Sequence, residues 1–304
     1  MTEMFQVTAT LLNLRRSPVI NHTNIIGKLG QGELVQKIGQ PSADWLQVQN
    51  SHLSGFAAAR FLSAIEVPEP APTPPATGAK VFIPPKVNFP LGPLARLDST
   101  EQRHCPLTGF AVRARESGQS DPTRCVTLND LVRLLDVEHS ARYLPTGITF
   151  CNIYAYDYCY LAGVYLPRVW WTAKALLDLK AGANVGVVYA KTVSEMTANA
   201  LFDWFSQWGD EFGWQSCTDL NALQDAADHG AVGVICAQRK DLSRSGHIVL
   251  VVPESQGHTA ARTGQTVTFP LQSQAGRRNK AYFSNEWWVA LAVQFRAHGF
   301  WTHP

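Results

Sequence analysis

Apolar and polar positions alternate in short runs through the first part of the chain, with turn residues between the runs. The runs are FQVTATLLNLRR, IIGKLGQGELVQKIG, DWLQVQ and GFAAARFL. A two-residue period is typical of half-buried strands. Gly27, Gly30 and Gly32 fall where tight turns or bulges need a residue without a Cβ. The pattern predicts a small all-β barrel over residues 1–66.

A change of composition follows this first domain. Residues 67–80, VPEPAPTPPATGAK, are dense in Pro, Ala and Thr and have no apolar period. Such a segment is typical of a semi-extended linker. It predicts a second domain over residues 81–304.

The second domain begins with helical patterns and continues with strands. Apolar residues recur at helical spacing in Thr127–Asp136 and in Ser194–Trp214, and a further helix is expected from Thr218 as N-cap to Gly230. Three apolar strands follow: AVGVICAQ, GHIVLVVPE and QTVTFPLQSQ. Helices followed by antiparallel strands predict an α+β fold, since a parallel sheet would alternate the two.

Composition narrows the function classes. The 304 residues are 45% hydrophobic, enough for a well-buried core, and the 26 basic and 24 acidic residues leave a net charge of +2. This balance argues against a nucleic-acid binder held by charge. No apolar run is long enough to cross a bilayer, and the N-terminal residues do not follow a signal-peptide pattern. We therefore expect a cytoplasmic product; delivery to the cell wall without a signal is the alternative.

Six cysteines are scattered along the chain without a CxxC pair: Cys105, Cys125, Cys151, Cys159, Cys217 and Cys236. This spacing favours neither a structural zinc site nor a disulfide framework, and no metal is expected. Cys151 stands out because Gly147 interrupts the chain upstream and the apolar residues after it fit a helix. Unpaired N–H groups at a helix start favour a thiolate, so Cys151 is the predicted nucleophile. Cys159 is predicted to lie in the core.

The histidine for this chemistry is predicted from its place in an apolar strand. His247 directly follows Gly246 and precedes the run Ile248–Val252. A strand start offers a rigid support for the ring, and the glycine is expected to leave room for a substrate backbone. The other eight histidines lie in the first domain, in the tail or in polar loops.

A third polar group is expected on the strand that pairs with this one. A hairpin about Ala260 would set position 273 opposite His247, with Gln272 and Gln274 on the face beside it. A carboxamide can accept from the imidazole N–H and fix its tautomer. Gln274 is favoured because its strand ends there, and Gln272 is the alternative.

Further roles are expected around the helix start. The backbone N–H of Cys151 or Asn152 is a candidate donor to an oxyanion. Asp157 is a candidate partner for Arg168. Four aromatic residues are candidates for the wall of a substrate groove, with core packing as the alternative: Tyr154, Tyr156, Trp170 and Trp171.

The first domain resembles the bacterial SH3 family in five short phrases. They are Leu12-Asn13-Leu14-Arg15, Gly27-Lys28-Leu29-Gly30, Trp45-Leu46-Gln47-Val48, Gly55-Phe56 and Phe61-Leu62. The chain departs from the family at RRSPV, which lacks the usual glycine, and at Phe56, which replaces Trp. The resemblance implies a module that binds cell-wall material or shapes a catalytic cleft; a packing domain without its own ligand is the alternative.

The second domain resembles the papain-like cell-wall hydrolases. Thr149, Cys151, Asn152, Tyr154 and Asp157 follow the form T-x-C-N-x-[YF]-x-x-D, and a G-H-[IV] strand comes later. This order looks like the NlpC-type peptidases and, more closely, the cysteine, histidine-dependent amidohydrolases/peptidases (CHAP). It covers roughly residues 146–276. The distance from Cys151 to His247 is longer than usual in these families, so residues 169–229 would be an insertion.

These resemblances imply a papain-like domain, with helices packed on an antiparallel sheet, preceded by an SH3-like barrel. They imply a peptidoglycan hydrolase that cleaves an amide of the stem peptide, as endopeptidase or amidase, and that acts on peptidoglycan or muropeptides. The alternatives are a catalytically inactive wall-binding adaptor and an acyltransferase with the same triad. A monomer is favoured, and the mechanism needs no cofactor.

Overall fold

The fold is that of a computed structural model of the chain. It describes residues 3–21, 24–49, 54–65, 82–89, 95–107, 118–291 and 293–304. The chain divides into two compact units, residues 1–80 and 81–304. Residues 67–80, the predicted linker, lie outside the described residues.

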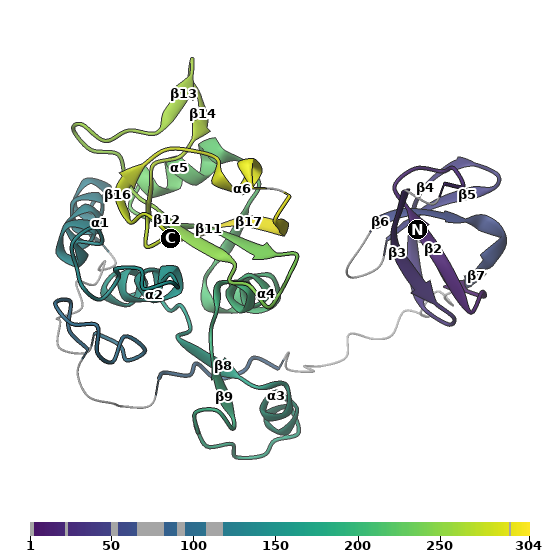
Figure 1. Ribbon diagram of the computed structural model, residues 1–304, viewed down its shortest axis with the longest axis horizontal. Helices are drawn as coiled ribbons and strands as arrows, with labels where there is room; N and C mark the ends of the chain where they lie inside the picture. The colour runs from purple at the N-terminus through teal and green to yellow at the C-terminus, as the bar shows by residue number, and fades with distance from the viewer. Residues whose placement is uncertain are drawn as a thin grey trace. The chain divides into compact units, whose positions relative to one another are not determined.

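The first unit is a small antiparallel β domain (Figure 1). Its strands are β1 (Met4–Val7), β2 (Leu11–Arg15), β3 (Ile25–Gly30), β4 (Leu34–Ser42), β5 (Trp45–Gln49), β6 (Ser54–Ala58) and β7 (Leu62–Ile65), with a 3-10 turn at Ala59–Phe61. Alternate residues enter one core, among them Leu12, Leu14, Leu46 and Val48. The two-residue period thus located the strands.

Closure of a barrel is not found among the described strands. The sheet order is β3-β2-β6-β5-β4-β1-β7, and no pairing joins β3 to β7. The hydrogen-bonded pairing of β2 with β6 is limited to one register pair, Arg15 with Phe56. Of the three predicted turn glycines, Gly32 has a positive φ of 85° and Gly27 lies beside a bulge in the β2–β3 pairing.

The second unit is an α+β fold built on a six-stranded antiparallel sheet, in the order β10-β17-β11-β12-β15-β16. These strands are β10 (Gln215–Cys217), β17 (Phe295–His303), β11 (Val232–Arg239), β12 (His247–Val251), β15 (Gln272–Gln274) and β16 (Lys280–Phe283). The helices are α1 (Asp121–Leu135), α2 (Cys151–Leu161), α3 (Ala173–Lys180), α4 (Ala198–Trp208), α5 (Leu220–Asp228) and α6 (Trp287–Ala290). Two short ribbons complete it: β8 (Val169–Trp171) with β9 (Val193–Glu195), and β13 (Ala261–Thr263) with β14 (Thr266–Phe269).

Both faces of the central strands are covered by helices. Val234 and Leu250 belong to the larger core, which also contains residues of α1, α2 and α4. Ile235 and Val249, one position away, pack with Leu223 of α5 and with α6. Figure 1 shows α2 and α4 on one side of the sheet and α5 and α6 on the other. Burial on both faces explains why β11 and β12 are continuous apolar runs.

The boundaries of two helices and one strand differ from the sequence prediction. The helix predicted from Thr127 begins at Asp121 and ends at Leu135. The third helix is capped by Asp219, whose carboxylate accepts from the Asn221 N–H, and not by Thr218. The run QTVTFPLQSQ is divided at Pro270 into β14 and β15, since proline cannot donate to a ladder. Across the described residues, every helix is too short or too polar to cross a membrane.

Candidate active site

The thiol of Cys151 lies at the first residue of α2. The chain reaches the helix through Gly147, whose φ is 83°, and no side chain caps the helix start. The side chain is only 3% exposed. The backbone N–H groups of Asn152 and Ile248 donate to the sulfur. Because the first N–H groups of a helix have no partner within it, this position stabilises a thiolate.

His247, the first residue of β12, connects the cysteine to a carboxamide. Its Nε2 lies 2.7 Å from Gln274 Oε1, and its ring lies close enough to Cys151 for each group to shift the pKa of the other. The Gln274 Nε2 donates to the Arg278 carbonyl at 3.1 Å, which leaves the Gln274 oxygen facing the imidazole. The histidine Nε2 therefore carries a hydrogen, and Nδ1 is the nitrogen that can exchange a proton with the Cys151 thiol.

Cys151 and His247 shift each other's pKa in the directions that favour opposite charges on the two groups. Burial raises the pKa of the Cys151 thiol, but the hydrogen bond and charge of His247 outweigh it, and the pKa falls below the ordinary 9.0. Burial lowers the pKa of His247, but Cys151 and then Gln274 outweigh it, and the pKa rises above 6.5. Both shifts favour a thiolate–imidazolium pair.

Gln274 reaches the histidine through a register that differs from the predicted one. Leu250 pairs with Ser273 and Val251 with Gln272, so the strands are offset by three positions from the expected pairing of 247 with 273. The offset arises because the loop after β12 contains its own hairpin, β13–β14, before β15 begins. Gln274 still lies at the end of β15, level with the start of β12, because antiparallel strands begin and end at opposite ends.

Gln272, the alternative third residue, does not contact His247. It is fully buried, and its amide nitrogen donates to the Asn285 carbonyl at 2.8 Å. Its oxygen accepts from the Trp287 indole N–H at 2.9 Å. Trp287 in turn packs edge to face against the His247 ring, with centroids 4.7 Å apart. Gln272 is therefore linked to the histidine through this tryptophan.

Asn152 contributes its backbone to the site and its side chain to the fold. The carboxamide donates to the Met196 carbonyl at 2.9 Å. The backbone N–H faces the sulfur, the position from which an oxyanion donor would act.

The predicted groove residues are buried and do not line the cavity beside His247. Tyr154 bonds Ser273 through its hydroxyl at 2.6 Å, and Tyr156 stacks on Tyr160. Trp170 packs edge to face on Trp204, while the Trp171 indole N–H donates to the Pro85 carbonyl. The groove prediction was wrong for these four residues, because α2 and β8 are covered by protein on the sides where the aromatic rings project.

One further sequence inference needs correction. Asp157 pairs with Arg142 in a buried bidentate contact, with oxygen–nitrogen distances of 2.7 and 3.1 Å. Arg168 pairs with Glu195. Gly246 is required by packing between β11 and α4, because a Cβ there would lie 2.5 Å from the Ala237 carbonyl oxygen and from Asn199 Oδ1. Gly246 also lines the cavity beside His247, and the room expected there for a substrate backbone stays a prediction.

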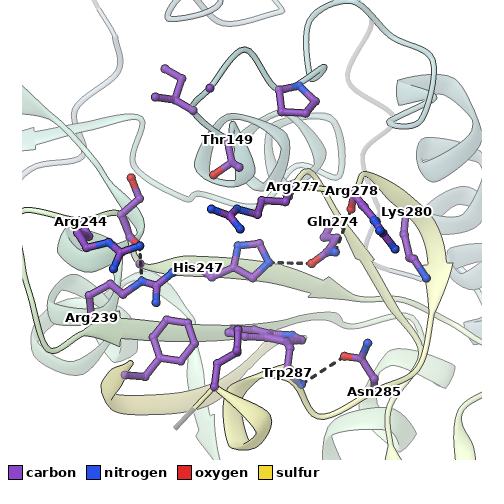
Figure 2. Close-up of a pocket in the computed structure, with 18 residues that line it drawn as sticks. Thr149, Arg239, Arg244, His247, Gln274, Arg277, Arg278, Lys280, Asn285 and Trp287 are labelled. Atoms are coloured by element: carbon purple, nitrogen blue, oxygen red, sulfur yellow. Dashed lines mark hydrogen bonds between the residues drawn. The ribbon is translucent and has the colours of Figure 1, made fainter. Parts of the chain in front are cut away.

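A cavity of about 890 Å³ opens beside the histidine. His247, Gln274, Thr149 and Trp287 contribute to its wall, and Figure 2 shows the His247–Gln274 contact within it. Cys151 lies behind this wall and presents only the small exposed fraction given above. Most of the remaining wall comes from residues 239–246 and 276–295.

A thiol at a helix start, an imidazole in contact with it and a carboxamide that orients the imidazole form the set required for nucleophilic cysteine chemistry. No protein-family model matches the chain, and no curated protein matches it. One solved structure that is similar is NlpC2 from Trichomonas vaginalis, with a TM-score of 0.22 and 10% identity over 98% of each chain. Similarity at this level carries no argument about fold or activity.

Proposed function

We propose that this protein is a cysteine hydrolase that cleaves an amide bond in the stem peptide of peptidoglycan. The observation that supports it most is the continuous contact from Cys151 through His247 to Gln274, with the cavity beside it. The pKa shifts of both groups also favour the reactive ionic form.

The proposed reaction balances with the groups present. The Cys151 thiolate attacks the amide carbonyl carbon, and the oxyanion is bound by backbone N–H groups at the start of α2. The His247 imidazolium then gives its Nδ1 proton to the leaving nitrogen, which departs as an amine and leaves a thioester. Water attacks the thioester while His247 removes its proton. The carboxylic acid leaves, and the thiolate–imidazolium pair is restored.

The substrate part of the proposal rests on sequence resemblance. The T-x-C-N and G-H motifs resemble cell-wall hydrolases, and the phrases of the first unit resemble bacterial SH3 modules. We propose residues 1–66 as an SH3-like module, residues 67–80 as a linker and residues 81–304 as a papain-like catalytic domain. In this arrangement, the first module would retain the wall polymer near the hydrolase.

The proposal is tested by mass spectrometry of purified peptidoglycan and of soluble muropeptides after incubation with the full chain. We expect one kind of product pair, a new amine end and a new carboxyl end in equal amounts, and its mass identifies the bond. Added hydroxylamine or glycine distinguishes an acyltransferase, which would give the aminolysis product in place of the acid. The absence of any new end from either substrate would refute the hydrolase.

Thiol alkylation checks the ionic form independently of the substrate. Iodoacetamide is expected to label Cys151 below pH 9.0, with a rate that rises as the pH passes through its lowered pKa, because only the thiolate reacts. Hydrolysis is expected to decline as the pH passes above the raised pKa of His247, because the leaving amine then lacks its proton donor. Peptide mass spectrometry gives the rate at each pH.

Cys125 is the internal control, since burial raises its pKa and its labelling should need more alkaline solution. Identical profiles for Cys125 and Cys151 would contradict the ion pair.

A further inference from the structure

The wall of the cavity carries positive charge on several elements. Of its 18 residues, five are cationic and none is acidic, whereas the whole chain has 26 basic and 24 acidic residues among 304. The five are Arg239, Arg244, Arg277, Arg278 and Lys280. The near-neutral chain therefore concentrates charge of one sign around the cavity that His247 lines.

None of these cations forms a salt bridge with a carboxylate among the described residues, although the charge of Arg244 lowers the pKa of Asp241. Arg239 uses its guanidinium on neutral groups, the Ser245 carbonyl, the Gln294 side chain and the Phe295 ring. Elsewhere in the described chain, arginines such as Arg133 and Arg262 are paired with acids. The cavity wall thus carries positive charge that no salt bridge of the described residues neutralises.

The cations repel one another and act on the histidine. Burial lowers the pKa of Arg239, and the charges of Arg244 and Arg277 lower it further. Arg239 also opposes the positive charge of His247. Charges that destabilise their own neighbours in the free protein gain most when an anion enters between them.

The cations of the cavity wall lie on two sides of His247. Figure 2 shows Arg239 and Arg244 on one side of His247, and Arg278 and Lys280 on the other. Arg239 and Arg244 flank the turn before β12, whereas Arg277 and Arg278 follow β15 and Lys280 begins β16. A ligand whose reacting amide lies at His247 would therefore contact cations on both sides of that amide.

We infer that the substrate carries free carboxylates on both sides of the bond that is cut, and that these cations bind them. The inference rests on the proposed function of Cys151 and adds the substrate class. Arginine binds carboxylate through two parallel N–H···O contacts, which fixes orientation as well as charge. A phosphate-bearing ligand shares the negative charge, and the experiments separate the two chemistries.

Two small alkylating reagents test the charge directly at the thiol. Iodoacetamide is neutral and iodoacetate is anionic; each forms an S–C bond with a thiolate and releases iodide. At low salt, the ratio of iodoacetate to iodoacetamide rates at Cys151 is expected to exceed that of 2-mercaptoethanol about tenfold. The excess should largely disappear at about 0.5 M NaCl, because salt screens the field.

Variants assign the effect to the cavity. The double variant R277Q/R278Q should lower the rate ratio at Cys151 severalfold. The double variant K180Q/K191Q is the matched control, since both lysines are exposed and lie outside the cavity, and it removes two charges of the same sign. Its rate ratio should equal that of the parent protein. An equal loss in both variants would show an effect of net charge alone and would overturn the inference.

Protection by glutarate and by inorganic phosphate separates the anions. Slower iodoacetamide labelling of Cys151 at lower glutarate than phosphate concentrations would support carboxylate binding, and protection by phosphate alone would overturn it. Peptide substrates with the flanking carboxylates converted to carboxamides should lose at least about tenfold in kcat/KM.

The two proposals fail in different ways. A Cys151 that reacts with iodoacetamide without preference for iodoacetate would overturn the anionic substrate and leave the hydrolase intact. A Cys151 that reacts with neither reagent would overturn both.

Discussion

A Cys151→Ala variant is expected to release amine from peptidoglycan at least about a thousandfold more slowly than the parent protein, because removal of a catalytic nucleophile leaves only binding and oxyanion stabilisation. The fold should be retained, since alanine is a good helix former and the change removes one buried atom from the start of α2. Amine release and circular dichroism are measured on the same preparations.

Cys217→Ala is the matched control. Cys217 is partly exposed on β10, and its thiol contacts the Asp219 carbonyl, away from the cavity. The Cys217→Ala variant should release amine from peptidoglycan at the rate of the parent protein. If Cys151→Ala were as active as Cys217→Ala, Cys151 would not be the nucleophile, whatever its thiol reactivity.

The largest loss of stability is expected from Asp157→Asn in the second unit. Asp157 and Arg142 have fully buried side chains, and the carboxylate also accepts from the Tyr143 hydroxyl at 2.8 Å. The asparagine has the same shape but leaves the Arg142 charge buried without a counterion. Loss of one partner from a buried pair costs about 3–5 kcal/mol in free energy of unfolding. Urea unfolding monitored by tryptophan fluorescence reports on this unit, which holds eight of the nine tryptophans.

An exposed pair provides the comparison. Asp130 contacts Arg133 on the surface of α1, with side chains 37% and 62% exposed. Asp130→Asn should cost less than about 1 kcal/mol, because water solvates both charges when the pair is broken. Equal costs for the two variants would show that the Arg142–Asp157 contact is not a buried pair in solution. A double variant, R142M/D157L, should recover part of the loss, since no unpaired charge then remains.

The residues of the candidate site could be predicted because their signals are local. A glycine followed by a helical pattern located the start of α2 at Cys151, and an apolar run located the start of β12 at His247. Gln274 was favoured from the end of its strand, and strand ends are marked by local turn residues. The antiparallel sheet then brings these three positions together, although the predicted register was three residues in error.

The walls of the site could not be predicted in this way. Trp287 and the cations at residues 277–280 come from segments after β15, and their approach to His247 depends on the path of the chain around β16. Arg142 lies in a loop before α2, and nothing in its own neighbourhood identifies it as the partner of Asp157. The aromatic residues of α2 were misplaced because a helix covered on nearly all sides has no polar face to indicate which rings reach solvent.

The hydrogen bond between Tyr154 and Ser273 has a consequence for inhibitor design. Tyr154 follows Cys151 by one helical turn, and Ser273 precedes Gln274, so this buried contact joins the helix of the thiol to the strand of the carboxamide. An inhibitor bonded covalently to Cys151 would therefore lie against α2 and β15, which this hydrogen bond holds together. Selective covalent ligands should obtain their affinity from substituents that extend past His247 toward the five cations of the cavity wall.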